Sequence, residues 1–354
     1  MTTNSTLNSV PAEKVSFFDD PATGLRAVIV IHSTALGPAA GGCRFWTYAQ
    51  KDDATADALR LAEGMTYKNA LAGLPFGGGK AVIMRPEGEF DREALFKAFG
   101  KAVDSLGGNY ITAEDVGTHV SDMQAVRSVT RHVAGLPSDG SHAGGDPSPW
   151  TALGVFLSLR HAVERRLGGK LAGRTVAVQG VGNVGMELCR LLHEDGAYLV
   201  VADGSAERAA KAAQLYGAVV VRPEEILSAD VDVVAPCALG AVLNSQSIES
   251  LKAQVICGAA NNQLATPEDG RRLAARGILY APDYLVNAGG IINVVAEKMG
   301  EASAAVDERV RRIPERLEAV FDAAEASGEG PNFVADAMAR AIVAEARPQA
   351  RRVA

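Results

Sequence analysis

The feature that most constrains the fold of this chain is the segment Thr175–Gly204, TVAVQGVGNVGMELCRLLHEDGAYLVVADG. It contains the pattern G-x-G-x-x-G, and the apolar run before the pattern and the amphipathic stretch after it predict a strand followed by a helix. A second β-type run ends at Asp203, which lies 203 − 180 = 23 positions after Gly180, close to the roughly 20 expected in dinucleotide-binding units. A glycine-rich turn without a ligand is the alternative, but this context favours a Rossmann unit that binds NAD.

Each glycine of the pattern has a physical reason in such a unit. Gly180 would make the tight turn, Gly182 would let the backbone approach a pyrophosphate at the helix N-terminus, and Gly185 would allow the helix to pack closely on the strand. Asp203 would accept hydrogen bonds from the adenosine ribose and repel a 2′-phosphate, which favours NAD over NADP. Arg208 could oppose this preference, but we expect it to lie solvated on the next helix.

Strand-like and helix-like segments alternate on both sides of this unit. Beyond Trp150, short apolar β-runs alternate with helical patterns, which predicts a parallel sheet covered by helices on both faces. The first half has a β-run at Leu25–Ser33 and helical patterns at Asp52–Gly73 and Asp91–Gly108. Turn-forming residues fill Leu136–Pro149, which we interpret as the connection between two domains.

Composition argues against several classes of function. The 354 residues, 47% hydrophobic and 22% charged, suit a globular protein of two domains, and a net charge of −7 without a basic cluster argues against nucleic-acid binding. No apolar run approaches the roughly 18 residues that predict a membrane span, and the first ten residues lack the pattern of a secretory signal. The four cysteines form no C-x-x-C pair and the six histidines no H-x-x-x-H pair. We therefore expect no metal site, no disulfide framework and a cytoplasmic location.

A second informative segment, Gly64–Ile83, carries two lysines twelve positions apart. Lys68 lies in a segment of helical pattern, and Lys80 follows three glycines and opens the β-type run AVIM. The glycines would let a ligand approach closely, and burial beside a second cation would favour the uncharged lysine, which can act as a base. A glycine-rich turn with two solvated lysines is the alternative. A P-loop is excluded because Ala81 stands where the hydroxyl residue that binds magnesium is required.

Eight segments, in one order, resemble the glutamate/leucine/phenylalanine/valine dehydrogenase family, most closely its branched-chain and aromatic members. They are LGPAAGG, GMTYKNALAGLPFGGGKAVI, ITAEDVGT, DPSPWTALGV, VQGVGNVG, APCALG, GAANNQLA and YAPDYLVNAGGIINV, and the resemblance runs from about Leu25 to Ala344. It implies an α/β fold with an N-terminal α/β substrate domain containing a mixed sheet, a Rossmann NAD-binding domain, and a cleft between them. We expect residues 1–140 with the C-terminal helices of about 330–354 to bind substrate and form oligomers, and residues 141–329 to form the Rossmann domain.

The resemblance also implies the reaction, a reversible NAD-dependent oxidative deamination of an L-amino acid to a 2-oxo acid and ammonia. Carried over by position, Lys68 would bind the substrate carboxylate, Lys80 would activate the water that attacks the imine, and Asp115 would relay protons to and from the amine. This chemistry needs a cation, a base and a second acid or base, which these three residues supply. Taken alone, Asp115 would be interpreted as a loop carboxylate or a helix cap. The family further implies a homo-oligomer, a dimer or larger.

Other residues are carried over as binding residues. Gly41 and Gly42 would line the site for the substrate carboxylate, and Asn261 would contact the substrate. The residues expected around the substrate side chain are Ala40, Met65, Ala113, Ile291 and Val294. Beyond the glycines and Asp203, the residues expected at the cofactor are Thr151, Asn183, Val184, Cys237, Ala238 and Asn262.

The pocket residues indicate an apolar substrate. Ala40 and Val294 stand where glutamate-type relatives carry a lysine and a hydroxyl residue, so a buried side-chain carboxylate would be unpaired and disfavoured. Ala40 resembles phenylalanine-type members, whereas ITAEDVGT and DPSP resemble leucine-type members, so leucine, valine, isoleucine and phenylalanine all stay open. Trp150, where smaller residues are usual, either narrows the site or packs at the domain junction.

Two other functions are weighed against this one. A 2-hydroxy acid dehydrogenase would normally use a histidine paired with a carboxylate, together with an arginine for the substrate, and no histidine here lies in such a motif. A non-catalytic NAD-binding sensor predicts the loss of catalytic groups, yet Lys68, Lys80 and Asp115 are all present.

Overall fold

The computed structural model describes residues 11–138, 142–238 and 240–350 of the chain. The chain divides into two compact units, Met1–Pro137 with Val343–Ala354, and Ser138–Ile342. The first unit contains a mixed sheet and the second a parallel one, which confirms the expected α/β fold. The second unit extends to Ile342, whereas the sequence placed the helices from about residue 330 with the substrate domain. The functional assignment of the two units stays a prediction at this point.

The sheet of the first unit has the strand order β1-β2-β5-β3-β6, and β4 also pairs with β5. Its strands are β1 Lys14–Asp20, β2 Leu25–Ser33, β3 Ala39–Ala40, β4 Cys43–Trp46, β5 Gly77–Met84 and β6 Tyr110–Ile111. The strands β1, β2 and β5 are antiparallel, whereas β3 and β4 run parallel to β5 and β3 runs parallel to β6. The strands β3 and β4 therefore lie one after the other along the same edge of β5.

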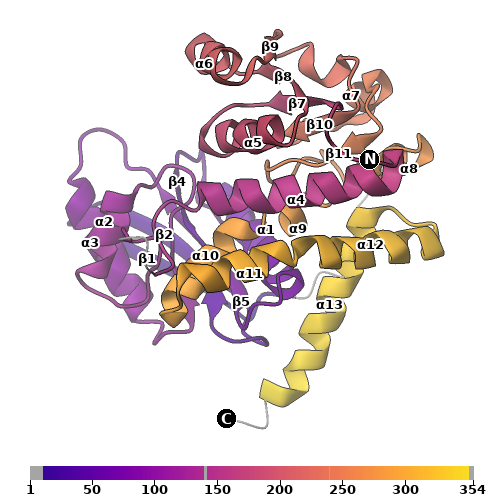
Figure 1. The fold of residues 1–354 in the computed structure, drawn as a ribbon. Helices are drawn as coiled ribbons and strands as arrows, with labels where there is room; N and C mark the ends of the chain where they lie inside the picture. The colour runs from indigo at the N-terminus through magenta and orange to yellow at the C-terminus, as the bar shows by residue number, and fades with distance from the viewer. Residues whose placement is uncertain (1–10, 139–141, 239, 351–354) are drawn as a thin grey trace, which may run out of the picture. The chain divides into compact units, whose positions relative to one another are not determined.

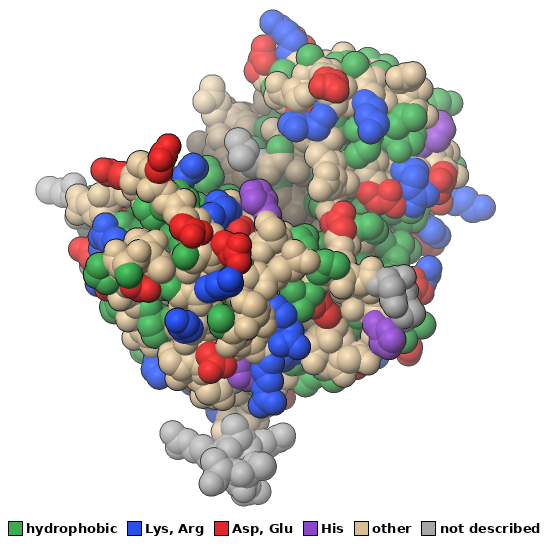
Figure 2. Space-filling view, turned by 90° about the vertical axis from the view of Figure 1, so that its left-hand side faces the viewer, with side chains coloured by type: hydrophobic (Ala, Val, Ile, Leu, Met, Phe, Trp, Pro, Cys, Tyr) green, Lys and Arg blue, Asp and Glu red, His purple; other side chains and the backbone are tan. Residues whose placement is uncertain are grey.

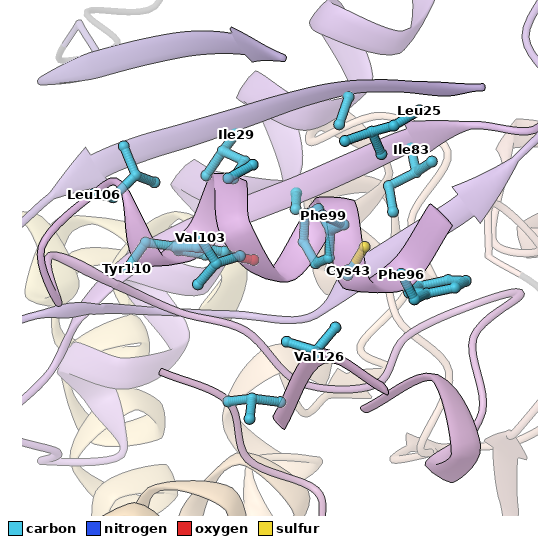
Figure 3. Close-up of a cluster of buried hydrophobic side chains, with 14 of the residues drawn as sticks. Leu25, Ile29, Cys43, Ile83, Phe96, Phe99, Val103, Leu106, Tyr110 and Val126 are labelled. Carbon is cyan, nitrogen blue, oxygen red and sulfur yellow. The ribbon is translucent and has the colours of Figure 1, made fainter. Parts of the chain in front are cut away.

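Both faces of this sheet are covered, because successive residues of a strand point to opposite faces. The helices of the unit are α1 Lys51–Leu71, α2 Arg92–Asp104 and α3 Val120–Arg127. On β2, Ile29 and Ile31 belong to a buried cluster with residues of α2, whereas Val28 and Val30 belong to a second cluster with alanines of α1. Figure 3 shows the first cluster, with Ile29 and Ile83 of the sheet beside Phe99 and Val103 of α2.

The sheet of the second unit is parallel throughout, with the order β12-β11-β10-β7-β8-β9. Its strands are β7 Thr175–Gln179, β8 Tyr198–Ala202, β9 Val219–Val220, β10 Val233–Pro236, β11 Val255–Ile256 and β12 Leu279–Tyr280. The strand order reverses between β7 and β10, which is the position where doubly wound sheets bind ligands beyond the carboxyl ends of their strands. The parallel sheet predicted from the alternating patterns is thus confirmed.

The helices of the second unit alternate with these strands and then end the chain. They are α4 Ser148–Leu167, α5 Asn183–Glu194, α6 Ala206–Tyr216, α7 Ser245–Ser250, α8 Glu268–Ala275, α9 Asp283–Val286, α10 Gly289–Met299, α11 Ser303–Arg311, α12 Ile313–Ser327 and α13 Pro331–Ala350, with a 3₁₀ turn at Ile226–Ser228. Figure 1 shows α4 and α12 side by side within this unit, in agreement with their contacts. The beginning of α13 belongs to this unit and its end to the first.

Charged side chains are distributed over the surface. Figure 2 shows lysines and arginines intermixed with aspartates and glutamates on the face in view. In the part of the chain that the structure describes, no helix is both long and apolar enough to cross a membrane.

Candidate functional site

Lys80 lies in the middle of β5, where it pairs with Val30 of β2. Only 6% of its side chain is exposed, so the interpretation as a solvated lysine is wrong for this residue. Its Nζ lies 3.0 Å from Oδ2 of Asp115. The fold thus brings a lysine and a carboxylate that are 35 residues apart (115 − 80) into direct contact.

The three glycines before Lys80 allow neighbouring backbone to pack closely against β5. A Cβ at Gly77 would lie 1.9 Å from the Ser33 carbonyl oxygen, and one at Gly78 would lie 2.1 Å from the backbone nitrogen of Thr66 on α1. A Cβ at Gly79 would lie 2.9 Å from the carbonyl oxygen of Val30. The space beside these glycines is filled by protein, which corrects the expectation that they open the strand to a ligand.

Asp115 lies in the connection between β6 and α3, and its turn is fixed by Thr118. The Asp115 backbone N–H donates to the Thr118 hydroxyl at 2.8 Å, and that hydroxyl donates to the Asp115 carbonyl at 2.8 Å. The Asp115 carboxylate accepts from Lys80 and from Arg44 Nε, the latter at 3.2 Å. Burial alone would raise the pKa of this carboxyl, but the charges of Lys80 and Arg44 outweigh burial and hold the pKa below its usual range. Asp115 is therefore an ionised carboxylate between two cations rather than a helix cap.

Gly41 and Gly42 lie between β3 and β4, opposite Gly79 and Lys80 of β5. The buried hydroxyl of Tyr110 donates to the Gly41 carbonyl at 2.8 Å, which fixes this short connection. A Cβ at Gly42 would lie 2.8 Å from Cβ of Asp115, so a larger residue would push the carboxylate away from Lys80. Their assignment to the substrate carboxylate stays a prediction.

Lys68 is half-buried on α1, the helix that packs on β5. On the same helix, Asn69 donates to the carbonyl oxygens of Gly77, at 2.6 Å, and Ala40, at 3.3 Å. Met65 Cγ lies 3.2 Å from the Cβ position of Gly41. The structure thus gathers residues 65–69 beside β5 and the glycine connection. Ala40 and Ala113 are buried in the same unit.

A candidate cofactor site lies in the second unit, at the fingerprint glycines. Gly180 has φ +92°, and a Cβ there would lie 2.6 Å from Cβ of Ala238, so the turn requires glycine. A Cβ at Gly185 would lie 2.0 Å from the Gly180 carbonyl, which is the close helix–strand packing expected of the third glycine. Gly182 is the exposed N-cap of α5, with no side chain capping the helix. This exposed helix N-terminus fits a dinucleotide pyrophosphate, and Asn183 and Val184 form the first turn of the same helix.

Asp203 follows β8 and reaches back to the glycine loop. Its carboxylate accepts from the backbone N–H of Val181 at 2.9 Å and from that of Ser205 at 2.7 Å. Arg208 adds a bond from Nη2 at 2.7 Å, although 56% of its side chain is exposed. Burial would raise the pKa of Asp203, but the bonds from Arg208, Ser205 and Val181 outweigh burial and lower it. Arg208 lies on the next helix with a largely exposed side chain, as expected, but it also binds the carboxylate that is expected to select the cofactor.

Asn261 and Asn262 are exposed in the loop between β11 and α8, and Asn262 has φ +54°, an uncommon value for a residue with a side chain. The loop is held from inside by Gln263, whose side-chain amide donates to the carbonyl oxygens of Gly258 and Ala260. Asn287 donates to Oδ1 of Asn261 at 2.8 Å. Neither amide is singled out by the sequence patterns. For Asn287 no spacing pattern could have done so, because it lies 26 positions from Asn261.

The remaining predicted residues also lie in the second unit. Thr151, on the first turn of α4, donates to the Pro147 carbonyl at 3.1 Å, and Cys237 and Ala238 directly follow β10. Ile291 and Val294 are half-buried and three residues apart on α10, so they share a helix face. Within the described residues, no group of three or more histidines, cysteines, aspartates or glutamates could hold a metal ion.

Comparison with known proteins identifies the family. The family model described as Glu/Leu/Phe/Val dehydrogenase, dimerisation domain, matches residues 12–132, and the model described as Glutamate/Leucine/Phenylalanine/Valine dehydrogenase matches residues 145–210 and 205–350. The chain belongs to the glutamate/leucine/phenylalanine/valine dehydrogenase family.

Individual members of this family match over nearly their whole length. Leucine dehydrogenase of Thermoactinomyces intermedius is 47% identical over 329 residues, which cover 92% of this chain and 89% of that one. Valine dehydrogenase of Streptomyces coelicolor is 45% identical over 341 residues, covering 95% and 93%. The crystal structure of L-tryptophan dehydrogenase from Nostoc punctiforme superposes with a TM-score of 0.83 at 42% identity, covering 96% and 98%.

Family membership decides the class of function. As an amino acid dehydrogenase, the chain is an oxidoreductase that acts on a CH–NH2 group and uses a nicotinamide dinucleotide. The predicted enzyme class is confirmed, and neither the 2-hydroxy acid dehydrogenase nor the non-catalytic sensor finds support in these comparisons.

Proposed function

We propose that this chain catalyses the reversible, NAD-dependent oxidative deamination of an apolar L-amino acid to its 2-oxo acid and ammonia. Lys68 binds the substrate carboxylate, Lys80 activates the water that attacks the imine, and Asp115 passes protons to and from the amine. The dinucleotide takes the hydride when it is bound, and the protein orients the substrate and excludes water.

One observation carries the proposal, the 3.0 Å contact between Lys80 Nζ and Asp115 Oδ2 at a buried position of β5. Deamination and the addition of water both move protons, and two groups in hydrogen-bond contact can exchange a proton without bulk solvent. A surface ion pair would not need a lysine side chain that is only 6% exposed. The burial of this pair therefore favours a chemical role over a role in surface stability.

The predicted pocket residues support an apolar substrate. Within the first unit, Ala40 and Ala113 are buried and offer only methyl groups. Within the second, Ile291 and Val294 share one face of α10. A carboxylate on the side chain of the substrate would lack a partner among such residues, so glutamate is disfavoured. The relatives named above are dehydrogenases of leucine, valine and tryptophan, which agrees with this preference.

A substrate panel tests the proposal. With NAD at alkaline pH, leucine, valine, isoleucine or phenylalanine is expected to give a rise in NADH absorbance, and glutamate at least about 100-fold less kcat/KM, because an unpaired buried charge costs several kcal/mol. Tryptophan belongs in the panel because of the Nostoc punctiforme relative. Absence of turnover with all five apolar amino acids would remove the proposed reaction.

The preference for NAD over NADP is proposed from Asp203. Only 6% of its side chain is exposed, and a 2′-phosphate beside this ionised carboxylate would be repelled. We expect kcat/KM to favour NAD by about 10–100-fold, which corresponds to about 1.4–2.8 kcal/mol. Asp203→Ser is expected to raise the use of NADP, since Arg208 is then released to pair with the phosphate. Asp203→Ser combined with Arg208→Ala should lose that gain, and an equal NADP rate in both variants would contradict the role given to Arg208.

Assembly and location complete the proposal. The matching model over residues 12–132 is described as a dimerisation domain, which supports a homo-oligomer built through the first unit. All four cysteines lie in the described part of the chain and are unpaired, which supports a reducing, cytoplasmic location.

A further inference from the structure

Arg44 connects Asp115 to a second carboxylate that none of the sequence motifs includes. Arg44 lies on β4, and 20% of its side chain is exposed. Its Nε lies 3.2 Å from Asp115 Oδ2, and its Nη1 lies 2.8 Å from Oδ2 of Asp57 on α1. Burial alone would lower the pKa of this guanidinium, but the two carboxylates outweigh burial and raise it, so Arg44 stays charged.

Asp57 is itself held in place from two sides. The Tyr48 hydroxyl donates to Asp57 Oδ2 at 2.7 Å, and Arg60 Nη2 lies 2.8 Å from Oδ1. Burial alone would raise the pKa of Asp57, but Tyr48, Arg60 and Arg44 together outweigh burial and hold it below its usual range. Arg44 therefore spans two fixed carboxylates, and its planar guanidinium can bond to each through a different nitrogen. A lysine, with a single nitrogen, could not bridge them in the same way.

Lys80 and Arg44 contact the same oxygen of Asp115, Oδ2. The negative charge of Asp115 is therefore shared between Lys80 and Arg44. The Arg44 guanidinium never loses its proton, so it always takes part of the attraction that Lys80 would otherwise receive in full. Because this site is largely buried, the sharing is not screened by water as it would be at the surface. Arg44 thus weakens the electrostatic attraction between Asp115 and Lys80.

Other ionisable groups lie on neighbouring elements of the first unit. They are His32 on β2, Lys68 on α1, Cys43 on β4, Tyr110 on β6, Glu114 beside Asp115, and Asp122 on α3, which pairs with Arg92. Burial raises the pKa of the Cys43 thiol and of the Tyr110 hydroxyl, so both stay neutral at the pH of an assay. Arg44 and Lys80 both contact Asp115 Oδ2 directly, at 3.2 Å and 3.0 Å.

We propose that Arg44, fixed by Asp57, is a positioning residue that holds the Asp115 carboxylate beside Lys80 and shares its charge so that Lys80 can act as a base. This inference rests on the proposed function, because it assigns Arg44 a part in that same proton chemistry.

The test compares Arg44→Gln, Arg44→Lys and Asp57→Asn with the wild-type enzyme. For Arg44→Gln, kcat is expected to fall about 10–100-fold, the effect of losing a hydrogen bond between charged groups. The rising limb of log kcat/KM against pH should move up by about one unit, because the variant lacks the Arg44 charge that shares Asp115 with Lys80. For Arg44→Lys, the pH midpoint is expected to return close to the wild-type value, because the positive charge is restored. Its kcat should stay below that of the wild type, because lysine cannot contact Asp115 and Asp57 at the same time. Asp57→Asn should lower kcat less than Arg44→Gln.

Controls separate a positioning role from a structural one. Arg127→Gln, an exposed arginine at the end of α3, is expected to keep the wild-type pH profile. NADH affinity and the thermal midpoint of each variant report on folding, and Arg44→Lys and Asp57→Asn keep the test decisive if Arg44→Gln does not fold. An active wild type whose Arg44→Gln variant loses kcat with an unmoved pH profile overturns the inference alone. A wild type without turnover overturns the proposed function and the inference with it.

Discussion

Lys80→Ala is expected to lower kcat by about 10²–10⁴-fold, the usual contribution of a group that moves protons in the transition state. NADH binding should persist, because Lys80 belongs to the first unit whereas the fingerprint glycines and Asp203 belong to the second. The variant removes the cation that lies 3.0 Å from Asp115 and leaves that carboxylate with Arg44 as its cationic partner. The measurements are kcat from NADH absorbance and the NADH dissociation constant from fluorescence.

Two further variants make this result interpretable. Lys80→Met replaces the buried methylene groups of lysine with an apolar side chain of similar length. A loss of kcat in both the alanine and the methionine variant is therefore caused by the missing amino group and not by a cavity. Lys101→Ala removes an exposed lysine of α2 and should leave both kcat and NADH binding unchanged. A near-normal kcat for Lys80→Met would exclude Lys80 from the chemistry.

The sequence predicts which residues are candidates for the chemistry better than it predicts what surrounds them. Lys80 and Asp115 could be named because each lies in a long motif that resembles the family. Arg44 contacts both Asp115 and Asp57, yet Arg44 and Asp57 are 13 positions apart with no spacing that marks a pair. Their contact depends on how β4 and α1 lie on the sheet, which no local pattern encodes. Arg208 differs, because it lies five residues after Asp203 and the distance alone allowed the contact that the structure shows.

The fold shows the same division between local and long-range information. The β-run at Leu25–Ser33 was predicted with the bounds that β2 has, because nine residues rich in valine and isoleucine form a strong local pattern. The strand β3 has only two residues and carries no periodicity to detect. It is a strand only because β5 and β6 offer hydrogen-bonding edges to it. Alternation of strands and helices predicted a parallel sheet in the second unit, but the pairing order comes from long-range packing.

Gly78→Ala is expected to destabilise the first unit strongly, although alanine usually stabilises a strand or helix relative to glycine. The new Cβ would lie 2.1 Å from the Thr66 backbone nitrogen and 2.2 Å from its hydroxyl oxygen. Backbone of α1 cannot rotate away as a side-chain end could, so the helix must move off β5. We expect the free energy of unfolding to fall by roughly 1–3 kcal/mol or more and the thermal midpoint by roughly 5 °C or more.

Gly64→Ala provides a matched control on the helix that Gly78 contacts. Gly64 lies within α1, and a Cβ there would meet no heavy atom within 4 Å. The same substitution should therefore raise the free energy of unfolding by about 0.5–1 kcal/mol, because alanine loses less backbone entropy in a helix. Differential scanning calorimetry of the two variants measures both shifts. Opposite signs are expected from the packing described here, whereas a stabilised Gly78→Ala variant would show that α1 does not need the close approach to β5. Since Asn69 on α1 also fixes the carbonyl oxygens of Gly77 and Ala40, a displaced helix should lower kcat together with stability.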